Sequence, residues 1–191
     1  KDPNNERIYF NARIEILLKT NQAEKAIDIL EKILDKDPDN TDILYHLALI
    51  YQRQERQAES ERVLRHILDV NPDDAFASNG LGYYYAEKGI KLVEARRLIE
   101  NAYRQKPLDW QMLDSMAWLC FREGRNEQAY YFALAAMRSG FHRVVIVHML
   151  DILVALGRQD EAQSVFNELS RRLPNDPKII ELGKRLKLLQ Q

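Results

Sequence analysis

The feature that most constrains this chain of 191 residues is a regular spacing of its prolines. Pro38, Pro72 and Pro107 lie 34 and 35 residues apart, and Pro174 follows after almost two further periods. A period of about 34 residues is typical of arrays of stacked helix-turn-helix units. Each unit in such an array buries its apolar face only against its neighbours. The spacing therefore predicts an all-α chain without a single central core.

Other positions repeat in phase with the prolines. Small residues recur with gaps of 34, 35, 34 and 33, at Ala26, Ser60, Ala95, Ala129 and Ala162. Before each of them, apolar residues three and four apart form one stripe, which indicates a helix. Each unit is therefore predicted to contain two helices and two short turns, and the units begin near Arg7, Thr41, Ala75, Trp110 and Arg143.

This pattern resembles the tetratricopeptide repeat (TPR) family over nearly the whole chain. The resemblance is strongest in Leu81-Gly82-Tyr83-Tyr84-Tyr85 with Ala95, and in Trp118 to Gly124 with Ala129. Departures are Ile14 in place of a small residue, Ser60 in place of alanine, an extra residue near Gly89, and a fourth unit that ends without proline. The resemblance implies a right-handed solenoid of helix-turn-helix repeats.

The two ends of the chain differ from the repeats. Residues 1–5 closely match residues 36–40, which end a repeat, so residues 1–6 are predicted to be the tail of a preceding repeat. Five repeats then occupy residues 7–175. Asp176-Pro177 begins a predicted closing helix at 176–191, whose apolar stripe of Ile179, Leu182, Leu186 and Leu189 would cover the last repeat.

The turn between the two helices of a unit carries glycine or asparagine in four units, at Asn21, Gly89, Gly124 and Gly157. These residue types enter the left-handed backbone region most readily. The positions are therefore predicted to end helices, and they need no phosphate-binding role.

Composition argues against several functions. The 28 basic and 29 acidic side chains leave a formal net charge of −1, which is no footprint for nucleic acid. Cys120 is the only cysteine, so an internal disulfide and a cysteine-metal cluster are excluded. Without a phosphate loop or a nucleophile motif, neither a cofactor, a metal nor a small-molecule substrate is expected. One pair argues for an enzyme: Asp151 follows His148 by three residues and could orient its imidazole.

In the TPR family the first helix of each unit builds the concave wall, so the resemblance implies candidate binding residues. Counting from the predicted unit starts, the fifth, ninth, twelfth and thirteenth places hold Tyr45, Asn79, Tyr83, Asp114, Trp118, Phe121 and Arg122. Tyrosine, tryptophan and arginine dominate binding hot spots. Trp118 and Phe121 could instead be core residues between helices. Asn79 and Asp114 could contact a peptide backbone, pair with each other or cap helix ends.

These observations predict a non-catalytic scaffold that binds a protein or peptide. The segments Ser78–Tyr83 and Leu113–Trp118 resemble bacterial cell-envelope TPR proteins, some of them outer-membrane lipoproteins that scaffold a processing protease or its substrates. That resemblance implies the periplasm or outer membrane, with the cytoplasm as the alternative. Membrane association would need a segment preceding Lys1. Two alternative functions are a self-association module and a regulatory domain of a larger enzyme.

Overall fold

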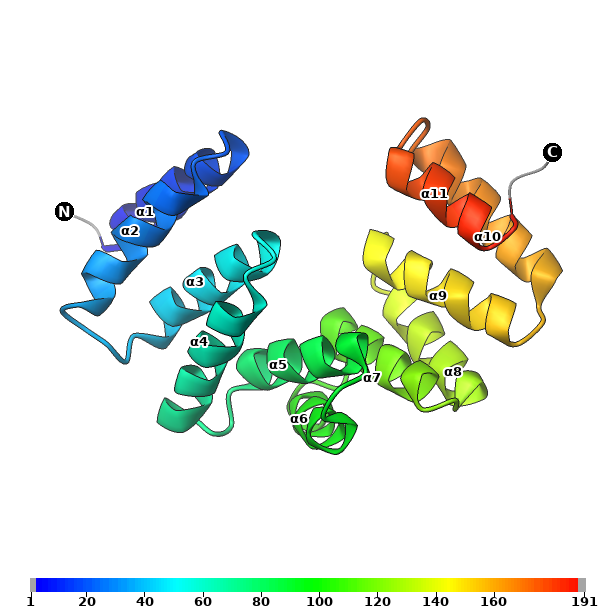
Figure 1. Cartoon of the computed structure of the whole chain (residues 1–191), viewed down its shortest axis with the longest axis horizontal. Helices are drawn as coiled ribbons and strands as arrows, with labels where there is room; N and C mark the ends of the chain where they lie inside the picture. The colour runs from blue at the N-terminus through cyan, green and yellow to red at the C-terminus, as the bar shows by residue number, and fades with distance from the viewer. Residues whose placement is uncertain (1–2, 189–191) are drawn as a thin grey trace. The chain divides into compact units, whose positions relative to one another are not determined.

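The computed structural model describes residues 3–188, and side chains from Tyr9 onward. Within that part of the chain the structure contains helices and no strand (Figure 1). The helices are α1 (Pro3–Lys19), α2 (Ala23–Leu34), α3 (Thr41–Arg53), α4 (Gln57–Val70), α5 (Ala75–Lys88), α6 (Leu92–Gln105), α7 (Trp110–Arg122), α8 (Asn126–Met137), α9 (Arg143–Ala155), α10 (Gln159–Arg172) and α11 (Pro177–Arg185). The prediction of an all-α fold is confirmed.

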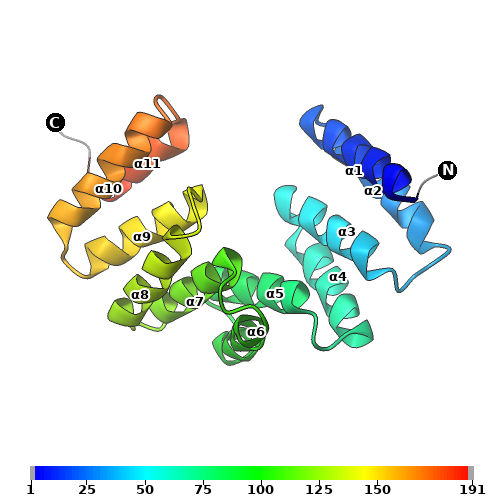
Figure 2. The ribbon, with the colours of Figure 1, turned by 180° about the vertical axis from the view of Figure 1, so that it is seen from behind.

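The chain divides into two compact units, Lys1–Ala77 and Ser78–Gln191. Inside each unit, helices contact their neighbours in chain order: α1, α2, α3 and α4 in the first unit, and α6 to α11 in the second. Helix α7 also contacts α9 directly, so the first helices of two successive repeats meet (Figure 2). This contact brings together residues one repeat apart in the sequence.

Helices α3, α5, α7 and α9 begin at the residues where the sequence predicts repeats to start. Local capping explains three of these starts. Asn40 Oδ1 accepts from the Ile43 amide at 3.1 Å, Asp74 from Ala77 at 2.8 Å and Asp109 from Gln111 at 2.8 Å. Each bond satisfies an amide that the first helical turn leaves without a partner.

The ends differ in detail from the predicted boundaries. Helix α1 begins at Pro3, four residues before Arg7, so residues 3–6 of the predicted tail are helical. Proline favours the first helical turn, because the amide it lacks would have no partner there. Helix α11 is capped by Asp176, and its residues Ile179 and Leu182 are buried in the core of the second unit. Leu189, the last residue of the predicted stripe, lies outside the described residues.

The predicted left-handed turns are confirmed, with φ between 57° and 75° at Asn21, Gly89, Gly124 and Gly157. The second repeat has Glu55 at the equivalent position, also left-handed at φ 58°. A side chain with a Cβ is unfavourable there, so this repeat keeps the turn at a cost in backbone strain.

The two helices of a repeat meet at the recurring small residues. Ala26, Ser60, Ala95, Ala129 and Ala162 are all at most 2% exposed. Gly82 of α5 faces this crossing, because a Cβ there would lie 2.7 Å from Ile99 Cγ1 of α6. The small residues therefore allow close approach of the helices, as their spacing predicts.

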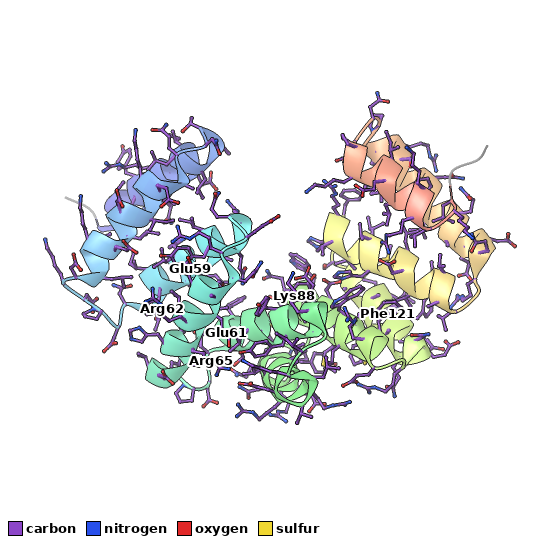
Figure 3. The ribbon with its side chains drawn as sticks, in the orientation of Figure 1. Glu59, Glu61, Arg62, Arg65, Lys88 and Phe121 are labelled. Atoms are coloured by element: carbon purple, nitrogen blue, oxygen red, sulfur yellow. The ribbon has the colours of Figure 1, made fainter. Side chains whose placement is uncertain are left out.

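Charged side chains of α4 pair with one another, as the balanced composition predicts. Arg65 Nε binds Glu61 at 3.2 Å within the helix (Figure 3). Arg56, at the N-cap position of α4, binds Glu59 through Nε at 2.9 Å, and Ser60 between the two acids is buried. These partly exposed pairs each contribute little to stability.

Candidate functional site

A buried hydrogen bond between a carboxylate and an imidazole joins the first helices of two successive repeats in the second unit. Asp114, in the middle of α7, accepts a hydrogen bond at 2.8 Å from Nδ1 of His148 on α9. Each of the two side chains is only 6% exposed. The residues are 34 positions apart, which is one repeat, and the direct contact of α7 with α9 brings them together.

Two aromatic side chains complete the surroundings of His148. The Tyr83 hydroxyl lies 3.3 Å from its Nε2, and the Trp118 ring stacks on the imidazole with 4.2 Å between centroids. A neutral imidazole that donates from Nδ1 to a carboxylate has its lone pair on Nε2. The Tyr83 hydroxyl can then donate to Nε2. We call Asn79, Tyr83, Asp114, Trp118, Phe121 and His148 the α5–α7–α9 cluster.

The phenol of Tyr83 is kept neutral by its surroundings. Burial raises the pKa of Tyr83, and the negative charges of Glu87 and Asp114 raise this pKa further. Loss of the phenolic proton would place a third negative group beside these two carboxylates. Tyr83 is therefore a hydrogen-bond donor in this cluster over the whole physiological pH range.

Two polar atoms of the cluster have no hydrogen-bond partner among the described residues. They are Oδ1 of Asn79, one turn before Tyr83, and Nε1 of Trp118, one turn after Asp114, and both atoms are buried. A buried group of this kind costs about 1–3 kcal/mol. One of the two atoms is an acceptor and the other a donor, so together they offer the complement of a peptide group.

Phe121 and Arg122 extend the predicted site in different ways. Phe121 lies near the end of α7 (Figure 3). Its ring stacks on Trp118 with centroids 5.1 Å apart and packs against the core of the second unit. Arg122 is exposed, and its Nη1 donates to the carbonyl of Glu87 at 2.6 Å. The guanidinium thus binds the C-terminal turn of α5, where cations are favourable.

Tyr45 belongs to the first unit, whereas the other predicted residues belong to the second. It borders a cavity of about 400 Å³ between α1, the start of α3 and the start of α5. Tyr45 and Phe76 form one wall of it, with ring centroids 6.0 Å apart. The predicted site residues therefore belong to two places, one in each unit.

Sequence reasoning missed the central role of His148. The signal was present, because Tyr45, Asn79, Asp114 and His148 follow one another at intervals of 34, 35 and 34 residues. The predicted start of the fifth repeat at Arg143 placed the count one residue early, on Val147.

The expected His148–Asp151 pair is wrong. Asp151 binds Arg185 of α11 at 2.6 and 3.0 Å, and the imidazole is oriented by Asp114 instead. Neither Asn79 nor a helix end is the partner of Asp114. The carboxylate that orients the imidazole thus comes from the preceding repeat.

Comparison with known proteins bears directly on the repeat. A family profile described as "Tetratricopeptide repeat" matches residues 17–79. The "TPR repeat-containing protein PA4667" of Pseudomonas aeruginosa is 31% identical over 135 residues, which are 71% of this chain and 23% of that protein. The chain belongs to the tetratricopeptide repeat family. Since it spans about a quarter of that TPR relative, the activity of the longer protein does not transfer to it directly.

Solved structures agree on the TPR fold. The thermophilic TPR protein TTC0263 of Thermus thermophilus superposes with a TM-score of 0.76 at 15% identity, covering 93% of this chain and 97% of that one. PilF of Pseudomonas aeruginosa superposes with a TM-score of 0.72 at 19% identity, covering 96% of this chain and 83% of that one. At these identities the likeness shows the solenoid fold alone.

Two features are absent from the described residues, a membrane span and a cluster of metal ligands. None of their helices is both long and apolar enough to cross a bilayer. Their His, Cys, Asp and Glu side chains form no group of three or more that could hold a metal ion.

Proposed function

We propose that this TPR protein is a scaffold that binds a polypeptide partner at the α5–α7–α9 cluster. The observation that carries the proposal is the way Trp118 and Tyr83 are held. Both are only partly buried, and both are fixed by His148, which the buried carboxylate of Asp114 orients. Aromatic side chains held rigid before binding lose little entropy when a partner arrives, which favours affinity.

The chemistry of the cluster suits an extended peptide. Trp118, Phe121 and Tyr83 offer partly exposed ring surface for an apolar side chain of the partner. Asn79 Oδ1 and Trp118 Nε1 could accept from a backbone amide and donate to a backbone carbonyl. Binding would then give partners to two atoms that have none in the free protein.

The same cluster argues against catalysis. Asp114, His148 and Tyr83 follow one another as a carboxylate, an imidazole and a hydroxyl, which is the order of a nucleophilic triad. A nucleophile in such a triad is activated when its proton is removed. The raised pKa of Tyr83 opposes that step, so a binding role fits the cluster better.

The affinity of Trp118 variants tests the proposal. The partner would be identified by cross-linking in the native cell and then purified for titration. We expect Trp118→Ala to weaken its binding by about 1–3 kcal/mol, roughly 5- to 150-fold in Kd. Trp110→Ala is the matched control, because Trp110 stacks on His142 outside the cluster. Wild-type affinity of both Trp118→Ala and Tyr83→Ala would contradict the proposal.

We further propose that the partner belongs to the bacterial cell envelope and that the scaffold presents substrates or a partner to a processing protease. This finer proposal is supported by the resemblance of Ser78–Tyr83 and Leu113–Trp118 alone. Fractionation of native cells tests the compartment, and accumulation of an unprocessed substrate in a deletion strain tests the protease. A cytoplasmic full-length protein would refute it while leaving the scaffold role open.

A further inference from the structure

The cavity of the first unit joins aromatic walls to carboxylates. Phe10, Tyr45 and Phe76 contribute rings, and Asp42 and Asp74 contribute carboxylates. Its volume of about 400 Å³ lies within the range of small-ligand pockets, roughly 300–1,000 Å³. The cavity lies entirely within the first unit and shares no residue with the α5–α7–α9 cluster.

The charge of the lining is negative. The lining residues include Asp42 and Asp74 but no lysine or arginine. The one histidine among them is His46. Asp42 lies in the first turn of α3, and Asp74 precedes α5 and accepts from the Ala77 amide. Each helix N-terminus carries about +0.5 of an elementary charge, so two termini offset about half of the two carboxylate charges. From the two aspartates, a net charge of about −1 is left for a ligand.

The walls select the kind of cation. Tyr45 and Phe76 lie at 56° to each other with 6.0 Å between centroids, so a flat group inserted beside one ring meets the other at an angle. Guanidinium is planar, weakly hydrated and stacks on aromatic faces, and it binds carboxylates through two parallel hydrogen bonds. The ammonium group of lysine is not planar and does not form two parallel hydrogen bonds to a carboxylate. The aliphatic stem of arginine would contact Phe10 and the remaining ring surface.

We propose that this cavity binds an arginine side chain of a polypeptide partner, between the aromatic wall of Tyr45 and Phe76 and the carboxylates of Asp42 and Asp74. The proposal rests on the proposed function only in taking the occupant from a polypeptide. Its residues and its test are separate from those of the α5–α7–α9 cluster.

Synthetic peptides test the proposal on the isotope-labelled chain. The probe is acetyl-Ala-Arg-Ala-amide, followed by amide chemical shifts in two-dimensional NMR at low and physiological salt. We expect saturable shifts centred on Thr41–His46 and Phe76, with a Kd in the millimolar range that rises with salt. The peptide with citrulline in place of arginine has the same shape without the charge, and we expect it to bind at least about tenfold more weakly. A lysine peptide should fall between them.

Variants locate the site. The double variant Asp42→Asn, Asp74→Asn should bind the arginine peptide at least about tenfold more weakly. Asparagine at position 74 keeps the helix cap. Asp73→Asn is the matched control, because Asp73 is exposed, adjacent and outside the cavity lining. Trp118→Ala should leave peptide binding unchanged, which separates this result from a failure of the scaffold proposal.

Three outcomes would overturn the proposal. The first is the absence of shifts in the cavity at 20 mM peptide, a concentration of order ten times the expected Kd. The others are equal binding of the citrulline peptide, and unchanged peptide binding by a double variant whose circular dichroism is that of the wild type. A free polyamine that binds more tightly than the arginine peptide would also overturn it, because the cavity would then select a small cation and not a side chain.

Discussion

Removal of Asp114 should destabilise the second unit strongly. The carboxylate and the imidazole of His148 are 2.8 Å apart and each 6% exposed, so neither group can turn to water when the other is lost. A buried polar group left without its partner costs about 1–3 kcal/mol, and a hydrogen bond to a charged group lies at the upper end of this range. We therefore expect Asp114→Ala to cost about 3 kcal/mol, or roughly 6–12 °C in Tm for a chain of this size.

Asparagine at this position is the sharper comparison. The amide oxygen of Asp114→Asn can still accept from His148 Nδ1, so the hydrogen bond is kept while the charge is lost. We expect the asparagine variant to lose less than half of what the alanine variant loses. A loss of equal size would show that the charge, and not the hydrogen bond, stabilises the pair.

A double-mutant cycle isolates the interaction. His148→Ala also removes the stacking partner of Trp118, so its own cost is expected at about 3–4 kcal/mol. If the two residues stabilise each other, the double variant should be about 2 kcal/mol more stable than the sum of the single losses predicts.

Urea unfolding provides the measurement. Circular dichroism at 222 nm reports the whole chain, and Trp118 fluorescence in a Trp110→Phe background reports the cluster. Because repeats can unfold separately, both probes are needed. Additive losses within about 0.5 kcal/mol would refute the reasoning, since they would mean that Asp114 and His148 do not depend on each other.

Three further predictions concern single residues. Gly82→Ala should lower stability by about 1 kcal/mol despite the better helix propensity of alanine, because its Cβ would lie 2.7 Å from Ile99 Cγ1; an unchanged urea midpoint would show that α5 and α6 can separate without cost. Glu55→Gly should raise stability by about 0.5–1 kcal/mol, because it relieves a left-handed φ of 58°; a lower Tm would contradict this. Tyr83 has a raised pKa in the folded protein, so its contribution to stability is complete below about pH 10 and is lost as the pH rises further; Tyr83→Phe should flatten that alkaline loss, and parallel stability curves above pH 10 would rule the contribution out.

The repeat could be predicted from the sequence because its signals are local. The small residues at the crossings, the left-handed turns and the starts of α3, α5, α7 and α9 each depend on a few neighbouring residues. Glu55 shows the limit of this reasoning. Its residue type does not favour a left-handed backbone, and only the position of the turn within the repeat requires one there.

The candidate site was less predictable, because its central pair depends on contact between repeats. Counting within the repeats predicts that Tyr83 of α5 and Trp118 of α7 line one concave stripe, and in the structure both contact His148. The fourth repeat ends at Ser139–His142 without a proline that would mark its end. The fifth position counted from Arg143 therefore falls on Val147, one residue before His148. An error of one residue on a helix turns the side chain by about 100°, which was enough to replace His148 by Val147.

Equivalent repeat positions have different physical roles in the two units. Asp114 and His148 occupy the same place in successive repeats, and because α7 contacts α9 they satisfy each other inside the protein. Tyr45 occupies that place in the first unit and borders a cavity that also contains Asp42 and Asp74. Loss of the Asp114 charge should therefore appear mainly in stability, whereas loss of the Asp42 and Asp74 charges should appear mainly in ligand binding. The fold of each repeat depends on the small residues where its two helices cross and on its left-handed turns. The position that holds Tyr45, Asp114 and His148 is neither of these, so its residue type can differ between repeats.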